Sequence, residues 1–307
     1  MAHHESWMSS NGPGLAPGRA MSRRSFVWVR VCAGVLFLSA AVTAGAQTNR
    51  ASGTGQAAQA VQEEDLTQPV PAEPDFSLVN LPTTLRLPKF KSNFHLTHRF
   101  QGDLTTGSFL DQLSNLFGID NGAIIGLEFR FAPMKDLQTV VFRSTLDKNL
   151  AMWAQYDGIR QRGSMPVSVS PIVSVEGTDN FSENFSPALG AVISHTSRER
   201  IALYAVPMWV HNSAPFDEGA TRDTFIFGIG GRWRIGQRVY VVAEVTPRLA
   251  GYEPGDPEYS FGIEKRVGGH MFQLTFSNSF ATTFGQLARG GTPSALYFGF
   301  NLGRKFW

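Results

Sequence analysis

The regular alternation of apolar and polar residues after residue 90 constrains the fold of this chain most. In residues 123–131, Ile125, Leu127 and Phe129 occupy every second position, and small or charged residues stand between them. Because successive side chains of a β-strand point to opposite faces, this pattern predicts a strand with one apolar and one polar face. The same pattern recurs in residues 224–235, 258–266 and 296–306.

The rest of the chain, interpreted in the same way, predicts about twelve strands. We expect them at residues 91–100, 122–131, 137–144, 150–158, 166–176, 187–196, 201–211, 224–235, 238–247, 258–266, 270–279 and 294–306. Short connections such as 132–136 alternate with longer ones such as 101–121. An even number of strands joined in this way is typical of an outer-membrane barrel. We therefore predict an all-β fold, a closed antiparallel transmembrane β-barrel over residues 90–307.

A soluble β-sandwich also alternates apolar and polar residues, so the content of the polar face decides between the two folds. Here acidic and basic residues alternate with Gly and Ser, as expected in a barrel lumen. The apolar face then meets lipid, and the sheet must close because lipid offers no partner to an unpaired backbone group. The residues that we expect to line the lumen are Glu128, Arg130, Arg143, Arg232, Arg234, Glu244, Glu264 and Arg266.

The first 46 residues have the features of an export leader. Residues 21–30 are basic, residues 31–42 are apolar, and Ala44 and Ala46 flank a glycine in a small-residue cleavage site. We predict an upstream extension over residues 1–20 and a signal peptide that is cleaved after Ala46. This leader indicates export and, together with the predicted barrel, an outer-membrane protein of a Gram-negative bacterium.

Residues 47–89 are rich in Gln, Ala, Glu and Pro and contain few aromatic residues. A segment of this composition buries too little apolar surface to order itself, so we predict a flexible periplasmic linker. Two short apolar pieces within it, residues 76–79 and 85–87, are candidates for packing onto the barrel as a strand or a plug.

Charge and cysteine content exclude several classes of function. The chain has 27 Lys and Arg against 25 Asp and Glu, and the excess of positive charge lies in the leader. The remaining chain is close to neutral and offers no electrostatic basis for binding nucleic acid. The single cysteine, Cys32, also lies in the leader, so the predicted mature chain has no thiol for catalysis, disulfides or metal binding.

The last strand ends on aromatic residues, as do the strands that the barrel assembly machinery recognises. We identify Phe306 and Trp307 as the candidate assembly signal. The apolar stripe of this strand ends on Phe306, so Trp307 is one place out of the usual register.

Several short motifs resemble those of a family of bacterial β-barrels, domain of unknown function 5777 (DUF5777), over about residues 90–307. The most specific pieces are Leu-Thr-His-Arg-Phe at residues 96–100 and Leu-Phe-Gly-Ile-Asp at residues 116–120. The motif residues are His98, Arg99, Phe100, Gly118 and Asp120. The resemblance implies a fold and an outer-membrane location but no activity, since a fold does not define a function.

The sequence offers little catalytic chemistry, and we expect no enzyme activity, cofactor or metal site. His95 and His98 would point to opposite faces of one strand, and so would Ser194 and His195. Residues 109–117 have apolar residues at helical spacing, which predicts a loop helix that either closes the barrel mouth or caps the barrel by packing.

We therefore expect an outer-membrane barrel for the passive binding or passage of a small solute. The alternative is a non-conducting structural or partner-docking barrel whose lumen is filled by salt bridges. A lipid-active outer-membrane enzyme is the least favoured function. The expected partners are outer-membrane lipids, the barrel assembly machinery and a small solute.

Overall fold

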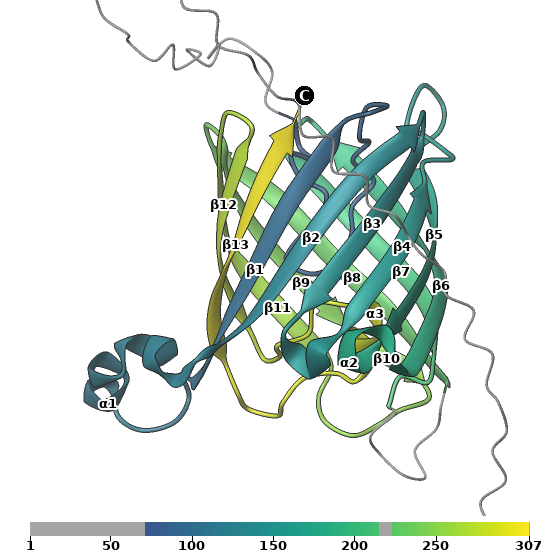
Figure 1. The fold of residues 1–307 in the computed structure, drawn as a ribbon. Coiled ribbons are helices and arrows are strands. Elements are labelled where there is room, and N and C mark those ends of the chain that lie inside the picture. The colour runs from purple at the N-terminus through teal and green to yellow at the C-terminus, as the bar shows by residue number, and fades with distance from the viewer. Residues whose placement is uncertain (1–70, 215–222, 307) are drawn as a thin grey trace, which may run out of the picture. The chain divides into compact units, whose positions relative to one another are not determined.

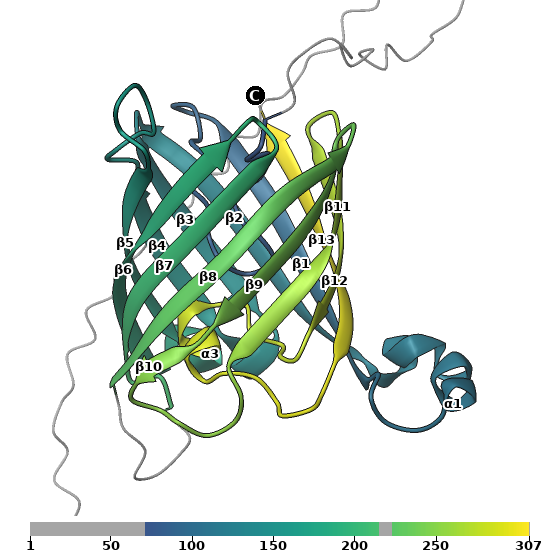
Figure 2. The same cartoon turned by 180° about the vertical axis from the view of Figure 1, so that it is seen from behind.

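A computed structural model describes residues 71–214 and 223–306, and its strands form a closed β-barrel. The long strands are β1 (Ser92–Asp103), β2 (Ala123–Met134), β3 (Leu137–Ser144), β4 (Leu150–Tyr156), β5 (Ser168–Gly177), β6 (Glu183–Ser197), β7 (Ile201–His211), β8 (Asp223–Gly236), β9 (Val239–Thr246), β11 (Glu258–Val267), β12 (His270–Ser277) and β13 (Tyr297–Phe306). Each strand pairs antiparallel with its neighbours, β1 pairs with β13, and β8 pairs with β9, so the sheet closes (Figure 1 and Figure 2).

The prediction of an antiparallel barrel of about twelve strands is confirmed. The short β10 (Arg248–Ala250) pairs with β8 beyond the end of β9, where Pro247 interrupts the pairing. Proline lacks the N–H that a ladder needs, which explains the break.

The two ends of the barrel differ in their connections. At the end where β1 begins and β13 finishes, four of the turns are tight: residues 135–136, 198–200, 237–238 and 268–269. We call this the short-turn end, and we call the opposite end, which carries the longer loops, the long-loop end. Residues 157–167, between β4 and β5, form the longer connection at the short-turn end.

The faces of the strands follow the sequence pattern. On β2, Leu127 and Phe129 are exposed on the outside, whereas Glu128 and Arg130 are buried inside. A row of aromatic rings crosses the outside of β1, β13, β12 and β11, with ring centroids 5.4–5.6 Å apart. Its members are Phe100, Phe298, Phe276 and Phe261. An apolar exterior of this kind is what the strands of a membrane barrel present to lipid.

The helices are short: α1 (Phe109–Ser114), α2 (Thr178–Phe181) and α3 (Phe284–Ala288), with 3-10 turns η1 (Leu116–Asn121) and η2 (Leu146–Lys148). No helix in residues 71–214 and 223–306 has the length and apolar character needed to cross a membrane. The prediction of a helix near residue 109 is correct, but its predicted place is wrong. Figure 1 shows α1 outside the barrel, where it neither enters the mouth nor caps the strands, and none of its residues is buried.

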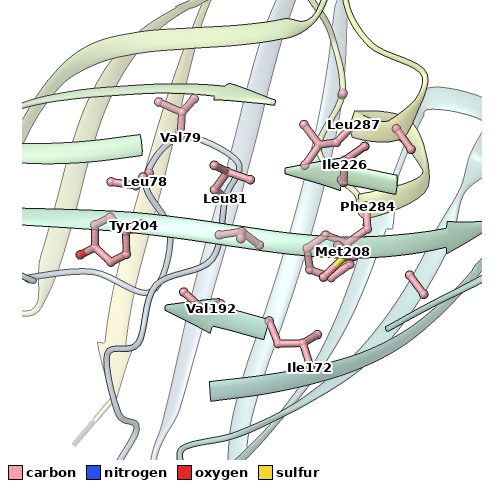
Figure 3. Packing of buried hydrophobic residues seen from close by; sticks show 14 of the residues in the cluster. Leu78, Val79, Leu81, Ile172, Val192, Tyr204, Met208, Ile226, Phe284 and Leu287 are labelled. Atoms are coloured by element: carbon pink, nitrogen blue, oxygen red, sulfur yellow. The ribbon is translucent and has the colours of Figure 1, made fainter. Parts of the chain in front are cut away.

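The apolar core of the molecule lies inside the barrel. Leu78, Val79 and Leu81 come from the segment that precedes β1, and Phe284 and Leu287 come from α3 (Figure 3). They pack against apolar residues on the inner wall of β5 to β9: Ile172, Val192, Ala202, Val206, Met208, Val210, Ile226 and Val242. The barrel is therefore filled from both ends.

This arrangement differs from the flexible linker expected up to residue 89. Residues 71–88 lie in the lumen, and Phe76, Leu78 and Leu87 are among their buried side chains. Their position agrees with the plug suggested by the apolar pieces at residues 76–79 and 85–87. The leader and residues 47–70 of the predicted linker lie outside the described residues.

The lipid-facing exterior leads to a first prediction. Ile263 lies near the middle of β11 and is 56% exposed, whereas Val267 lies at the end of this strand. We expect Ile263→Arg to destabilise the barrel by about 2–4 kcal/mol and Val267→Arg by about 1 kcal/mol or less, because a buried charge costs most at the bilayer midplane. Denaturant unfolding in phospholipid vesicles measures both. Equal costs at the two positions would contradict the membrane placement.

Candidate functional site

Residues 71–88 form a hairpin inside the barrel, which we call the lumen hairpin. Its turn is closed by the N–H of Leu78, which donates to the carbonyl of Leu81 at 2.8 Å. The N–H of Thr83 donates to the carbonyl of Phe76 at 2.9 Å and joins the two arms. Both arms therefore run from the short-turn end to the middle of the barrel.

The two ends of the lumen hairpin are fixed at the short-turn end. The hydroxyl of Tyr240, at the start of β9, donates to the carbonyl of Pro71 at 2.8 Å. On the other arm, the side-chain amide of Gln138, at the start of β3, donates to the carbonyl of Leu85 at 3.0 Å. The chain thus enters and leaves the lumen through the same opening.

Glu244 on β9 holds the turn of the lumen hairpin. Its buried carboxylate accepts hydrogen bonds from the backbone N–H groups of Val79, Asn80 and Leu81, at 3.0, 2.8 and 3.1 Å. Each hydrogen bond to a charged group contributes about 1.5–3 kcal/mol. A carboxylate that accepts three N–H groups of one tight turn recognises the shape of that turn.

The side chain of Asn80 is bound on both sides of its amide group. Its Nδ2 donates to Glu258 and to Ser260, each at 3.1 Å. Its Oδ1 accepts from Nη2 of Arg99 at 3.0 Å, and Nη1 of Arg99 donates to Asn301 at 2.7 Å. Asn80 therefore contacts hydrogen-bond donors and acceptors that match its amide group. An apolar side chain of the same size could not bind these partners.

The wall also binds backbone carbonyls of the lumen hairpin. The pairs are Arg232 with Ser77 (2.7 Å), Gln273 with Leu78 (2.8 Å) and Asn301 with Val79 (3.1 Å). Arg232 in addition forms a buried ion pair with Glu264 at 2.8 Å. The wall residues that bind these carbonyls thus come from β8 (Arg232), β12 (Gln273) and β13 (Asn301).

The apolar side of the lumen holds the leucines of the turn. Gly228 on β8 faces Leu81: a Cβ at this glycine would lie 2.7 Å from Cδ2 of Leu81. Gly230, two residues further on, faces Leu78 in the same way. These two glycines on the lumen face therefore make room for the side chains of the hairpin turn.

Cations flank the ring of Phe76. The guanidinium of Arg130 and the ammonium of Lys305 each lie 5.1 Å from the ring centroid. Arg130 also pairs with Glu128 at 3.1 Å, and Lys305 donates to the carbonyl of Pro74. Cation–π contacts out of water are worth about 2 kcal/mol, so the first arm is held by its side chain as well as by its backbone.

The second arm leaves the barrel past the turn between β2 and β3. Arg86 pairs with Asp136 in that turn at 2.7 Å, and Arg160 pairs with the same carboxylate at 2.6 Å. Desolvation raises the pKa of Asp136, but the hydrogen bonds and charges of Arg160 and Arg86 outweigh it and keep the pKa below its usual value. This contact is therefore present at neutral pH and is lost as the pH falls through the lowered pKa.

The loop between β12 and β13 fills the lumen from the long-loop end. Its helix α3 is buried, and Glu176 on β5 accepts hydrogen bonds from the hydroxyl of Thr283 and the N–H of Gly285, both at 3.0 Å. A cavity of about 20 Å3 remains between this loop and the hairpin, lined on one side by Asn80 and on the other by Phe284. Such a volume holds about one water molecule.

The structure brings most of the predicted lumen residues together. Glu128, Arg130, Arg232, Glu244 and Glu264 are buried inside the barrel. Arg234 and Arg266 also face inward, half-buried near the short-turn end.

Arg143 does not line the lumen, and its predicted position is wrong. On β3 the inward residues include Val140 and Phe142, so Arg143 faces outward. Its guanidinium donates to Asn180 at 2.9 Å and to the carbonyl of Asn149, in loops at the long-loop end. The inner wall here is apolar, so the rule that charges mark the lumen face fails on this strand.

The family-motif residues divide between the two faces of β1. Arg99 is fully buried and binds the lumen hairpin, whereas His98 stacks on Phe300 outside, with centroids 4.7 Å apart. Phe100 also faces outward, in the aromatic row. Gly118 and the exposed Asp120 lie in η1.

The remaining candidates stay apart. Phe306 faces outward, and Trp307 lies outside the described residues. Ser194 is buried against Thr84 at 2.5 Å, whereas His195 is exposed and contacts the carbonyl of Pro166 at 2.7 Å. Across residues 71–214 and 223–306, no group of three or more His, Cys, Asp or Glu side chains gathers as metal ligands would.

Three further residues bind the hairpin but are not among the predicted lumen residues: Glu258, Gln273 and Asn301. Glu258 and Asn301 stand on the polar face of alternating strands, so the period-two pattern could have placed them in the lumen. Their partners, Asn80 for Glu258 and Val79 for Asn301, lie in a proline-rich segment without periodicity, so the sequence gives no local signal for these contacts.

The closed sheet, the apolar exterior and the polar, filled interior define an outer-membrane β-barrel protein. Residues 75–306 match DUF5777, described as a membrane bound beta barrel domain, and the chain belongs to this family. The match begins inside the lumen hairpin, so the family includes the hairpin turn as well as the strands.

No curated protein matches the chain. Among solved structures, the KdgM porin is similar with a TM-score of 0.46 and 8% identity, over 70% of this chain and 99% of the porin. The NanC porin has a TM-score of 0.46 and 7% identity, over 71% of this chain and all (100%) of the porin. A variant porin of Rhodopseudomonas blastica has a TM-score of 0.33 and 11% identity, over 60% and 55% of the two chains.

The glycine beside Leu81 leads to a second prediction. We expect Gly228→Ala to displace the hairpin turn, at a cost of about 1–3 kcal/mol for overpacking. Hydrogen exchange at residues 79–81 should accelerate, and the added change Leu81→Ala should restore protection. The matched control is Gly231→Ala, whose Cβ would meet only the outer face near Leu203. No effect of Gly228→Ala would mean that the turn is not seated there.

Proposed function

We propose that this outer-membrane barrel passes small solutes and that the lumen hairpin is its removable plug. The observation that carries the proposal is the route of the hairpin, which enters and leaves through the short-turn end. Within residues 71–214 and 223–306, no strand of the barrel pairs with it, so its withdrawal breaks side-chain contacts and no strand pairing there.

The charges of the lumen wall support a removable plug. Arg99, Arg232, Glu244, Glu258 and Glu264 are buried when the hairpin is in place. Buried ion pairs gain little stability over well-packed apolar residues, so a permanently closed barrel has no need of them. In a lumen that fills with water after withdrawal, the same groups are solvated and offer polar partners to a solute.

A non-conducting barrel is the second candidate, and α3 favours it. The loop of α3 fills the lumen from the opposite end, and its buried contacts with Glu176 resemble those of a permanent core. In this case the charged residues of the lumen serve only to hold the two inserted segments to the wall. Lipid contact around the barrel and recognition of the last strand by the assembly machinery remain predictions under both candidates.

Conductance in planar bilayers separates the two candidates. We expect the unmodified protein to be closed for most of the time, and a variant lacking residues 72–88 to conduct. A second variant adds a Gly-Ser replacement of residues 280–291, which removes α3 as an obstacle. Folding of both variants is checked by their heat-modifiable migration in gels. If both variants fold and neither conducts in any salt or voltage, the passage function is wrong.

Glu244 allows the same question to be tested without a deletion. Glu244→Ala removes the acceptor of three hydrogen bonds to the hairpin turn, whereas Glu244→Gln keeps one uncharged acceptor. The loss of even one such bond, about 1.5–3 kcal/mol, corresponds to a rise of about tenfold or more in the open fraction. We expect single-channel recordings to give the order Ala above Gln above unmodified protein.

The control for this series is Glu253→Ala, which removes an exposed carboxylate in the loop before β11. It should leave the open fraction unchanged. An equal rise of the open fraction in Glu253→Ala and Glu244→Ala would show that net charge controls opening, and not the hydrogen bonds between Glu244 and the hairpin turn.

A further inference from the structure

The loop helix outside the barrel takes no part in filling the lumen. Residues 109–121, which we call the projecting element, contain α1 and η1 at the long-loop end (Figure 1 and Figure 2). Its large apolar side chains are exposed, and Phe109 and Leu110 are 71% and 72% exposed. The exposed set is Phe109, Leu110, Leu113, Leu116, Phe117 and Ile119. The exposure of so many ordered apolar side chains to water is unfavourable, and a surface of this kind is typical of an interaction site.

The projecting element is held in place by close contacts with β1. Gly118 has φ +85° and packs against Gly102 so closely that a Cβ on either glycine would overlap the backbone of the other. The N-terminus of α1 is fixed by Ser108 and Asp111, whose side chains cap each other's backbone N–H. The direction of the element is thus set by backbone contact and capping, and not by burial of its apolar residues.

The apolar surface of the projecting element continues the lipid-facing surface of the barrel. Its η1 turn contacts β1 and β13. The outer faces of these two strands carry Phe100 and Phe298 of the aromatic row. A segment that extends sideways from this rim, with apolar side chains exposed, has the properties of an interfacial anchor.

We propose that the projecting element lies on the outer surface of the membrane, with its apolar side chains inserted into the lipid. Residues 104–122 contain Asp111 and Asp120 and no Lys or Arg, so apolar burial and not attraction to anionic headgroups holds them there. Lipid is favoured over a second copy of the chain, because the apolar surface of the projecting element is continuous with the aromatic row on the outside of β1 and β13. This inference does not depend on solute passage.

Site-directed spin labelling tests the placement. In a Cys32→Ser background, a nitroxide is attached at Leu110→Cys or Leu113→Cys, and at Glu253→Cys as a water-exposed control at the same end of the barrel. The labelled protein is reconstituted into phosphatidylcholine nanodiscs that hold one barrel each. Collisions with oxygen, which partitions into lipid, are compared with collisions with a water-soluble nickel complex.

We expect the labels at residues 110 and 113 to collide with the nickel complex several-fold less often than the label at residue 253, and more often with oxygen. Equal nickel accessibility at all three sites would overturn the proposal. Protection that appears only when several barrels share a bilayer would also overturn it, in favour of a second copy. Replacing phosphatidylcholine by an anionic lipid should leave the protection unchanged.

Discussion

The hydrogen bonds between Glu244 and the turn of residues 79–81 organise the interior of this barrel. A buried carboxylate requires compensation, and here the compensation comes from three backbone N–H groups of a segment that is not part of the wall. This hairpin turn places Asn80 between Arg99 and Glu258. It also places Leu81 against Gly228 and Leu78 against Gly230. The lumen is therefore complementary to one short peptide turn.

This complementarity has an apolar part and a polar part. The inner faces of β5 to β9 offer apolar side chains to Leu78, Leu81 and α3, while polar side chains from β8, β9, β12 and β13 bind the hairpin backbone. A simple porin interior would be polar throughout. On β3 the inner face carries Val140 and Phe142 together with Gln138 and Ser144, and Arg143, expected in the lumen, lies on the outer face.

The barrel could be predicted from the sequence because each strand carries its own period-two signal, as in residues 123–131 and 258–266. The lumen positions of Glu128, Arg232 and Glu264 followed from the same alternation. The hydrogen bonds between Glu244 and the hairpin turn could not be predicted from the sequence. They join Glu244 to residues about 165 positions earlier and use backbone N–H groups, which carry no sequence signal. The place of α1 was also hidden, because apolar residues at helical spacing fit a buried cap and a lipid-facing surface equally well.

The lumen hairpin is a loop that enters the ring of strands from one side and leaves on the same side, so neither arm is threaded through the barrel. Tension applied at residue 71 peels the first arm from the wall in sequence, at Tyr240, then Lys305, then Arg232, before it reaches the turn at Glu244. Bonds loaded one after another yield at lower force than bonds loaded together. Under the proposed function, a pull from the short-turn side therefore loads these contacts one at a time and leaves the pairing of the strands unloaded.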